Sequence, residues 1–315
     1  MNLLSTRMEK SKKKRKWPLW LGSIFIAILL IVGATIFYIW NQINSTVDTM
    51  HNPLSRDNDP ERQKELEAIF KDTKAVNVLL LGVDERSGDK GRSDTMILLS
   101  LNPKTNAMKM ISIPRDTYVN IPGRGKDKIN HAYAFGDVEL SVQTVEENFD
   151  IPVHYYASVN MEGFKQGIDA LGGVTVTNKT AFSQGGSEFP KGDVQLNGEQ
   201  ALDYIRMRKN DPRGDLGRNE RQRAVIMAAI NKGASFSSIT KFGDILTILG
   251  DNVKTNLDMD DMQTLFSNYR NTRNNISTIE IKGNGQMIGG IWFYVVPESE
   301  FSRVQSEIKT HMDGK

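Results

Sequence analysis

The chain has 315 residues, of which 25% are charged and 39% are hydrophobic, a composition typical of a folded globular protein with a sizeable core. Seven Lys/Arg and one acid lie in residues 1–16, so the remaining residues hold 33 bases and 37 acids. This slightly acidic body disfavours a nucleic-acid partner, and the absence of cysteine excludes disulfides, thiolate metal sites and thiol nucleophiles.

The first distinct element is an uncharged apolar run at residues 17–40. As a helix it would span about 36 Å at about 1.5 Å per residue, which is enough to cross a hydrocarbon core of roughly 30 Å. Aromatic residues stand near both ends, and the basic residues 1–16 precede it, which predicts a cytoplasmic N-terminus and an outward-facing body. A cleaved signal peptide is the alternative, but the run is long and residues 43–45 form a poor cleavage site.

These features predict a single-pass type II protein of the cell membrane. Residues 1–16 form the cytoplasmic tail, residues 17–40 the transmembrane anchor, residues 41–73 an extracellular linker and residues 74–312 the main folded domain. The linker is rich in Asn, Asp, Ser and Pro, which favour loops, and a short helix is expected at residues 61–71.

From residue 74 onward, apolar runs typical of strands alternate with amphipathic stretches typical of helices. The expected strands are residues 76–83, 95–101, 108–113, 155–159, 174–177, 276–281 and 292–296. The expected helices are residues 137–148, 161–171, 199–206, 219–232, 239–249, 258–270 and 298–311. Interleaved helices and strands predict a layered α/β fold.

Two carboxylates flank the first two expected strands. Asp84 follows the strand at 76–83, and Asp94 precedes the strand at 95–101. Adjacent strands would bring the two together, where they repel unless a cation or a proton intervenes. Hard oxygen ligands suit Mg²⁺, which binds through one or two carboxylates plus substrate phosphates. On spacing alone, an equal alternative is that both carboxylates cap turns in the loop.

Arginines follow in two places. Arg115 comes directly after a strand that ends in proline, and a guanidinium suits bidentate phosphate recognition. For this segment alone, a surface ion pair with Asp116 is the better interpretation.

Arg206 and Arg208 are two residues apart, so they converge only where the helix ends or the chain is extended. Arg218, Arg221 and Gln222 share one helix face. A guanidinium cluster beside the apolar stripe that continues this helix is suited to binding a pyrophosphate. The alternative is a solvated basic face, although the cluster stands out from an acidic body.

Several segments together are similar to one protein family, in the same order along the chain. They are Gly82-Val83-Asp84, Arg92-Ser93-Asp94-Thr95, Ile113-Pro114-Arg115-Asp116, Lys128 to Tyr133, Gly172-Gly173-Val174, Leu196 to Arg208, and Asp215 to Gln222. The sequence resembles the LytR-CpsA-Psr family, and within it the teichoic-acid transferases of Bacillus-type cells.

The resemblance implies an α-β-α sandwich with a central mixed sheet and a large apolar cavity for a polyprenyl chain. It implies that Asp84 and Asp94 bind Mg²⁺, and it points to Asp94 and Arg115 as catalytic residues. Independently of the resemblance, a free carboxylate is suited to take the acceptor's proton, which makes Asp94 the candidate base. The implied pyrophosphate-binding residues are Arg92, Arg115, Arg206, Arg208, Arg218 and Gln222.

The implied reaction moves an anionic glycopolymer, wall teichoic acid, from an undecaprenyl-pyrophosphate carrier to a muramic-acid hydroxyl of peptidoglycan. The expected partners are therefore the lipid-linked glycopolymer, peptidoglycan and the membrane. Two alternatives stay open: a pyrophosphatase that acts on the same lipid with water as acceptor, and a non-enzymatic envelope regulator.

Overall fold

The computed structural model describes residues 37–38, 41–85, 91–208, 211, 213–235, 245 and 248–314. The chain divides into two compact units, Met1–Asn44 and Ser45–Lys315, and the fold below is that of the second. Within the described residues, no helix is both long and apolar enough to cross a bilayer. The predicted anchor at residues 17–40 lies outside the described part of the chain, except for Phe37 and Tyr38.

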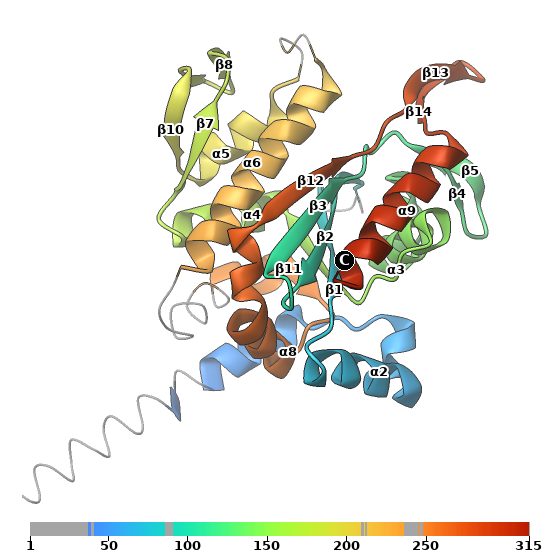
Figure 1. The fold of residues 1–315 in the computed structure, drawn as a ribbon. Helices are drawn as coiled ribbons and strands as arrows, with labels where there is room; N and C mark the ends of the chain where they lie inside the picture. The colour runs from blue at the N-terminus through green and yellow to red at the C-terminus, as the bar shows by residue number, and fades with distance from the viewer. Residues whose placement is uncertain are drawn as a thin grey trace, which may run out of the picture. The chain divides into compact units, whose positions relative to one another are not determined.

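A six-stranded mixed sheet forms the centre of this unit, in the order β11-β6-β1-β2-β3-β12 (Figure 1). Its strands are β1 (Val76–Val83), β2 (Ser93–Asn102), β3 (Ala107–Ser112), β6 (Tyr155–Asn160), β11 (Val253–Thr255) and β12 (Ile276–Glu280). The strands β1, β2 and β3 pair antiparallel in sequence, whereas β6 is parallel to β1 and β12 is parallel to β3. The predicted α/β fold and its central mixed sheet are therefore confirmed.

Helices cover both faces of the sheet, with α3 and α9 on one side and α4, α5 and α6 on the other (Figure 1). The α-helices are α2 (Pro60–Lys71), α3 (His131–Phe149), α4 (Met161–Ala170), α5 (Gly198–Arg206), α6 (Asp215–Gly233), α8 (Met259–Thr264) and α9 (Glu298–Met312). The smaller two-stranded pairs are β4 (Tyr118–Ile121) with β5 (Gly125–Lys128), β7 (Val174–Asn178) with β10 (Gly192–Leu196), β8 (Phe182–Gln184) with β9 (Ser187–Phe189), and β13 (Asn284–Ile288) with β14 (Ile291–Val295).

Two helix predictions differ from the structure in detail, and a third is not tested. The helix α3 begins at His131, earlier than predicted, because it continues across a kink at Gly136 and Asp137. Asp258 caps α8 as its side chain accepts a hydrogen bond from the Asp261 amide at 2.7 Å, but the helix soon gives way to a π turn and a 3-10 turn. The helix predicted at residues 239–249 falls mostly outside the described residues.

Side chains alternate along each strand, so the two faces of the sheet carry different residues and have different surroundings. On one face, residues such as Leu79, Leu98 and Ile111 belong to a solid core that also includes side chains of α3 and α9. On the other face, Val78 and Leu99 line an apolar pocket. One face of the sheet is therefore covered by a closely packed layer, whereas the layer on the other face combines a second core cluster with a pocket.

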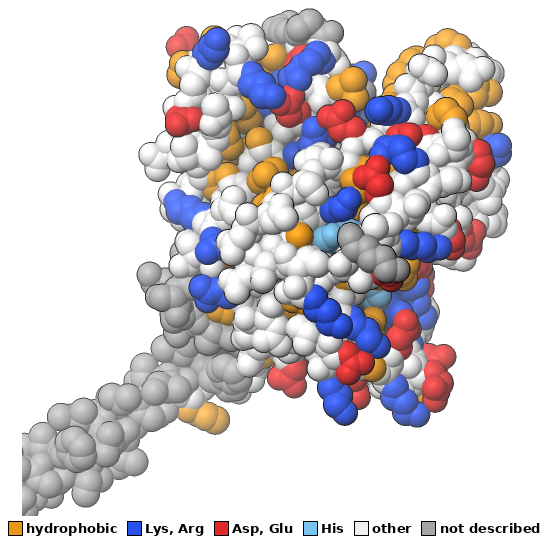
Figure 2. Space-filling view, in the orientation of Figure 1, with side chains coloured by type: hydrophobic (Ala, Val, Ile, Leu, Met, Phe, Trp, Pro, Cys, Tyr) orange, Lys and Arg blue, Asp and Glu red, His pale blue; other side chains and the backbone are white. Residues whose placement is uncertain are grey.

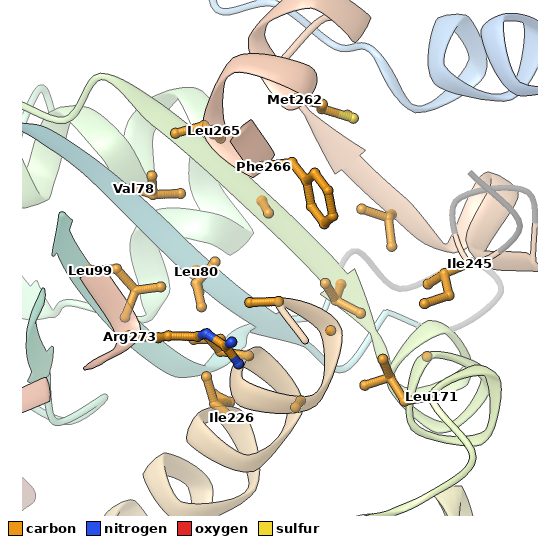
Figure 3. Close-up of a pocket in the computed structure, with 18 of the residues that line it drawn as sticks. Val78, Leu80, Leu99, Leu171, Ile226, Ile245, Met262, Leu265, Phe266 and Arg273 are labelled. Carbon is orange, nitrogen blue, oxygen red and sulfur yellow. The ribbon is translucent and has the colours of Figure 1, made fainter. Parts of the chain in front are cut away.

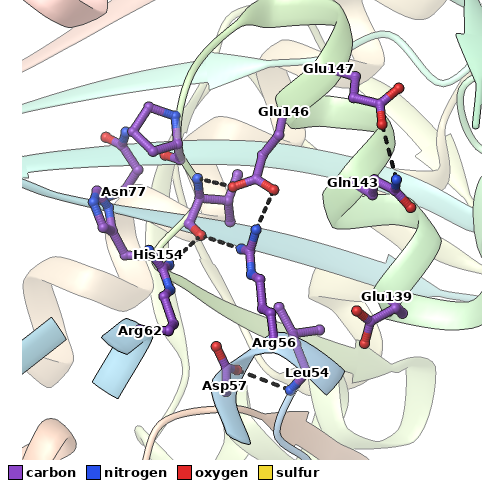
Figure 4. Close-up of polar contacts among 12 residues, drawn as sticks. Leu54, Arg56, Asp57, Arg62, Asn77, Glu139, Gln143, Glu146, Glu147 and His154 are labelled. Carbon is purple, nitrogen blue, oxygen red and sulfur yellow. Dashed lines mark hydrogen bonds and ion pairs between the residues drawn. The ribbon is translucent and has the colours of Figure 1, made fainter. Parts of the chain in front are cut away.

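The segment predicted as a linker is held against the domain over its second half. Leu54 is buried in the core beside α3. The Arg56 guanidinium donates to Glu146 at 2.5 Å and to the Val153 carbonyl at 2.7 Å, and Arg62 donates to the same carbonyl at 3.2 Å (Figure 4). These contacts tie the segment before β1 to α3 and to the loop that leads into β6.

A buried histidine lies at the centre of this contact. His154 is 3% exposed, and its Nδ1 accepts a hydrogen bond from the Asn77 amide at 2.9 Å (Figure 4). Burial, together with the nearby positive charge of Arg62, lowers the pKa of His154 from 6.5 to about 4. The imidazole is therefore neutral in the folded protein at neutral pH.

This pKa predicts an acid-dependent loss of stability. The folded pKa lies below the unfolded value, so the contribution of His154 is complete above pH 6.5 and is lost as the pH falls toward 4. Between pH 7 and pH 5, the free energy of unfolding should fall by about 2 kcal/mol more in the wild type than in His154→Gln. Urea unfolding at the two pH values measures this difference, and equal pH slopes would contradict the assignment.

Candidate functional site

The predicted acidic residues lie at one end of the β1–β2 pair. Val83 is paired with Ser93, and the Asp84 amide donates to the Arg92 carbonyl at 3.2 Å. Gly91 has a φ of +66°, and a Cβ there would lie 2.2 Å from the Asp84 carbonyl oxygen, so only glycine lets the chain return this closely. Asp84, Arg92 and Asp94 are thus carried by the same end of the sheet.

Arg115 is fixed beside one of these carboxylates. Its Nη1 donates to Asp94 Oδ1 at 2.7 Å, and its Nε lies 3.5 Å from Asp116 Oδ2. The other oxygen of Asp116 accepts from Lys128 Nζ at 2.6 Å, so two cations share this carboxylate. The ion pair with Asp116 that the sequence suggested as an alternative is present, and it orients Arg115 toward Asp94 instead of leaving it in solvent.

Three of the predicted arginines meet around one polar pocket with a volume of about 410 Å³. Arg115 enters it from the end of β3, Arg208 from the segment after α5, and Arg218 from the first turns of α6. Arg213 and Asn219 also line the pocket, and Asp116 is its one acidic residue among the described residues. The pocket therefore carries a net positive charge suited to a phosphate-bearing ligand.

The remaining predicted phosphate ligands lie nearby but outside this pocket. Arg206 is exposed at the end of α5 and shares an adjoining pocket with Arg208, since the chain is extended at Met207 between them. Gln222 is buried one turn beyond Arg218 on α6, and Arg92 is exposed at the start of β2. Neither Gln222 nor Arg92 lines the polar pocket.

Arg221 holds the site together from within. Its Nη1 donates to Asp211 Oδ2 at 2.7 Å and its Nη2 to the Met207 carbonyl at 2.6 Å. These bonds tie the segment that carries Arg208 to α6. Arg221 therefore has a structural place, although its spacing from Arg218 on the helix suggested a shared ligand.

A second pocket, with a volume of about 530 Å³, opens against the other part of α6 and is lined almost entirely by apolar side chains (Figure 3). The sheet supplies Leu80 and Leu99, α6 supplies Ile226, and the turn after α8 supplies Phe266. Arg273 also lies at its wall, where it donates to the Asn231 carbonyl at 2.7 Å.

The two pockets lie along one helix. Arg218 of α6 lines the polar pocket, and Val225, seven residues later, lines the apolar pocket. That spacing corresponds to about 10 Å along the helix axis. The arrangement can accommodate an amphiphile with an anionic head and a hydrocarbon tail.

Sequence reasoning assigned no role to several residues at the polar pocket. They are Asn219, Trp292 and Tyr294. The last two belong to the short hairpin β13–β14, whose Gly289-Gly290 turn was visible in the sequence. Their proximity to the arginines depends on the tertiary fold, so no local sequence pattern predicts it.

Residues 37–310 match the LytR_cpsA_psr family. The chain therefore belongs to this family, as its motifs suggested. A protein of Oceanobacillus iheyensis named polyisoprenyl-teichoic acid–peptidoglycan teichoic acid transferase TagU is 63% identical over 313 residues, which cover 98% of each chain. The protein of the same name from Bacillus subtilis is 48% identical over 308 residues, covering 98% of this chain and 99% of that one.

Solved structures support the same relationship. The crystal structure of B. subtilis TagU is 48% identical and aligns with a TM-score of 0.62 over 76% of this chain and 97% of that one. A structure described as TagT bound to LIIa-WTA is 34% identical, with a TM-score of 0.71 over 84% of this chain and all of that one.

Proposed function

We propose that this protein is a transferase that moves teichoic acid from a polyisoprenyl carrier to peptidoglycan. The observation that carries the proposal is the pairing of an arginine-lined pocket with an apolar pocket along α6. An undecaprenyl-pyrophosphate-linked glycopolymer combines the two matching chemistries, a diphosphate and a long hydrocarbon. The names of the relatives describe the same donor and acceptor.

In the proposed reaction, a muramic-acid hydroxyl attacks the phosphorus that bears the glycopolymer. A new phosphodiester bond forms, the bond between the two phosphates breaks, and polyprenyl phosphate leaves. Such transfers depend on positioning and on stabilising charge, not on covalent help from the protein. Arg115, Arg208 and Arg218 would stabilise the charge on the phosphates, and Asp94 would accept the proton of the hydroxyl.

The carboxylate oxygens of Asp84 and Asp94 are hard ligands of the kind that Mg²⁺ prefers. The same end of the sheet carries both residues, and neither is fully buried, so a bound ion could reach both. Bound there, Mg²⁺ would add positive charge beside the phosphates. Arg92 and Arg206, at the borders of the site, would contact the outer phosphate oxygens, and Gln222 would support Arg218 from the next helical turn.

The predicted anchor at residues 17–40 suits this substrate. A lipid-linked donor stays in the membrane, and an anchor would keep the catalytic domain near it and raise the effective concentration. We therefore propose a cytoplasmic tail and an extracellular catalytic domain, which places the site where peptidoglycan lies.

The transferase proposal predicts a covalent product. Full-length protein incubated with a lipid-diphosphate-linked sugar, peptidoglycan oligomers and Mg²⁺ should yield a phosphodiester-linked conjugate detectable by mass spectrometry. Arg115→Ala should reduce its rate by about 100-fold, because one positioned donor to the transition state is lost. Arg124→Ala removes an exposed arginine that lines neither pocket and should leave the rate unchanged.

Other outcomes would identify the alternatives. Free sugar phosphate in equal amount with and without peptidoglycan would indicate a pyrophosphatase. A cellular function that survives Arg115→Ala together with Asp94→Ala would indicate a regulator without enzymatic activity.

The metal proposal predicts that Asp84→Asn raises the Mg²⁺ concentration required for half-maximal rate by about tenfold or more, since one anionic ligand is removed. Calorimetric titration of Mg²⁺ in the presence of a prenyl diphosphate measures the same loss without turnover. Glu85→Gln is the matched control, because the neighbouring carboxylate is ion-paired with Lys254 at 3.5 Å. An equal effect of both substitutions would point to general surface charge instead of a site.

If the apolar pocket binds the lipid tail, substitutions that fill it should affect long polyprenyl donors more than short ones. Ala229→Phe places a ring inside this pocket and should lower the rate with a long polyprenyl donor by about tenfold, because a ring there competes with the tail for volume. A donor with a short prenyl chain should be much less affected. Asn231→Phe adds the same ring at an exposed position of α6 and should affect neither donor. Equal losses with both donors would place the lipid elsewhere.

A further inference from the structure

The hairpin β13–β14 carries the largest group of exposed apolar side chains that the structure describes. Met287, Ile291 and Trp292 are 61%, 54% and 42% exposed. Figure 2 shows hydrophobic side chains gathered over this hairpin at the upper right of the molecule. Among the described residues, no core cluster includes Trp292, so packing in the protein core does not explain why a tryptophan occupies this position.

The hairpin is attached directly to the polar site. The Tyr294 amide donates to the Asp116 carbonyl at 2.8 Å, and Thr117 forms a β-bridge with Tyr294. On the opposite face, Phe293 is buried, and the centroid of its ring lies 4.7 Å from the centroid of the Tyr118 ring. The hairpin is therefore fixed next to Arg115.

Trp292 and Tyr294 share one face of β14, because side chains alternate along a strand, and both line the polar pocket. Two glycines of the facing segment leave room for their rings. A Cβ at Gly285 would lie 2.8 Å from Trp292 Nε1, and a Cβ at Gly283 would lie 2.8 Å from the Tyr294 ring. Tyr294 is held further by its hydroxyl, which donates to the Ile281 carbonyl at 3.1 Å.

The two rings differ in what they are able to do. Tyr294 is tied down and partly buried, whereas Trp292 presents an exposed indole at the wall of a pocket that four arginines also line. Pyranose sugars stack the apolar C–H face of the ring on such an indole, while their phosphate substituents require cations. The pocket volume of about 410 Å³ lies in the range of small-molecule sites, roughly 300–1,000 Å³.

We propose that Trp292 stacks on a pyranose ring of the substrate, next to the phosphates held by the arginines. The inference deepens the proposed transferase function and rests on it. Two rings could supply this chemistry: the first sugar of the lipid-linked donor and the acceptor sugar of peptidoglycan. The shared ligand is a pyranose, and the experiment separates the two sources.

The sequence offers a direct optical probe of this site. Trp292 is the only tryptophan outside the predicted anchor, which contains Trp17, Trp20 and Trp40. The full chain with these three replaced by Phe reports on Trp292 alone through its fluorescence. Three probes are titrated: farnesyl diphosphate, a prenyl diphosphate that carries N-acetylglucosamine, and a peptidoglycan disaccharide added with farnesyl diphosphate.

A sugar-bearing ligand should change the Trp292 emission, and farnesyl diphosphate alone should not. Calorimetry should show that Trp292→Ala raises the Kd of that ligand by about tenfold, the size expected for the loss of an aromatic contact, with the Kd of farnesyl diphosphate unchanged. Trp292→Phe should restore most of the affinity. Ile291→Ala, which removes an exposed apolar side chain from the opposite face of β14, should have no effect.

The donor sugar is identified if the sugar-linked diphosphate responds, and the acceptor sugar if the disaccharide responds; either result supports the inference. An equal loss for farnesyl diphosphate in Trp292→Ala, or no change for any probe, overturns it. Conjugate formation by the wild type is scored separately. If the wild type forms the conjugate but sugar binding does not depend on Trp292, only this inference is wrong. If Trp292 binds the sugar but no conjugate forms, the proposed function is wrong.

Discussion

One helix carries the constraint on which the rest of this protein depends. The first turns of α6 present Arg218 to a polar pocket, and two turns later Val225 faces an apolar one. A regular helix fixes that separation at about 10 Å, so head-group and tail chemistry are held at a set distance. Arg221, on the same helix, binds Asp211 and the Met207 carbonyl and thereby brings the segment of Arg208 to the site. The helix therefore fixes the distance between a site suited to an anionic head group and a site suited to a hydrocarbon tail.

The sheet permits this arrangement because its two faces are used differently. The face toward α3 and α9 is closely packed and supplies stability. The face toward α6 contributes Val78, Leu80 and Leu99 to the apolar pocket. Val78 and Leu99 are buried in a second core cluster, and Leu80 is partly exposed. An apolar lining that the chain does not fill costs stability, and a hydrocarbon ligand would offset that cost.

The sequence predicted the helices and strands better than the tertiary contacts between them. Strong apolar runs located β1 to β3, because this signal is local. The end of α5 between Arg206 and Arg208 also followed from local geometry. The hairpin β13–β14 was only half predicted. The strand at 292–296 was expected, but its partner strand of equal length begins with Asn, Gly and Gln and therefore shows no apolar run. The contacts of Arg115 with Asp94 and of Trp292 with the arginine pocket depend on long-range packing, which a single sequence does not report.

The charge balance of the site follows from which carboxylates are already paired. Of the side chains that the structure describes, four arginines and one aspartate line the polar pocket, and Lys128 shares that aspartate. Asp94 lies against Arg115, so it offsets part of one guanidinium charge and at the same time fixes its direction. The pocket is therefore cationic but preorganised, with less side-chain entropy left to lose when a ligand binds. A cationic site that needs little rearrangement favours a dianionic diphosphate, because in the proposed transfer to a hydroxyl negative charge develops on the polyprenyl phosphate that leaves.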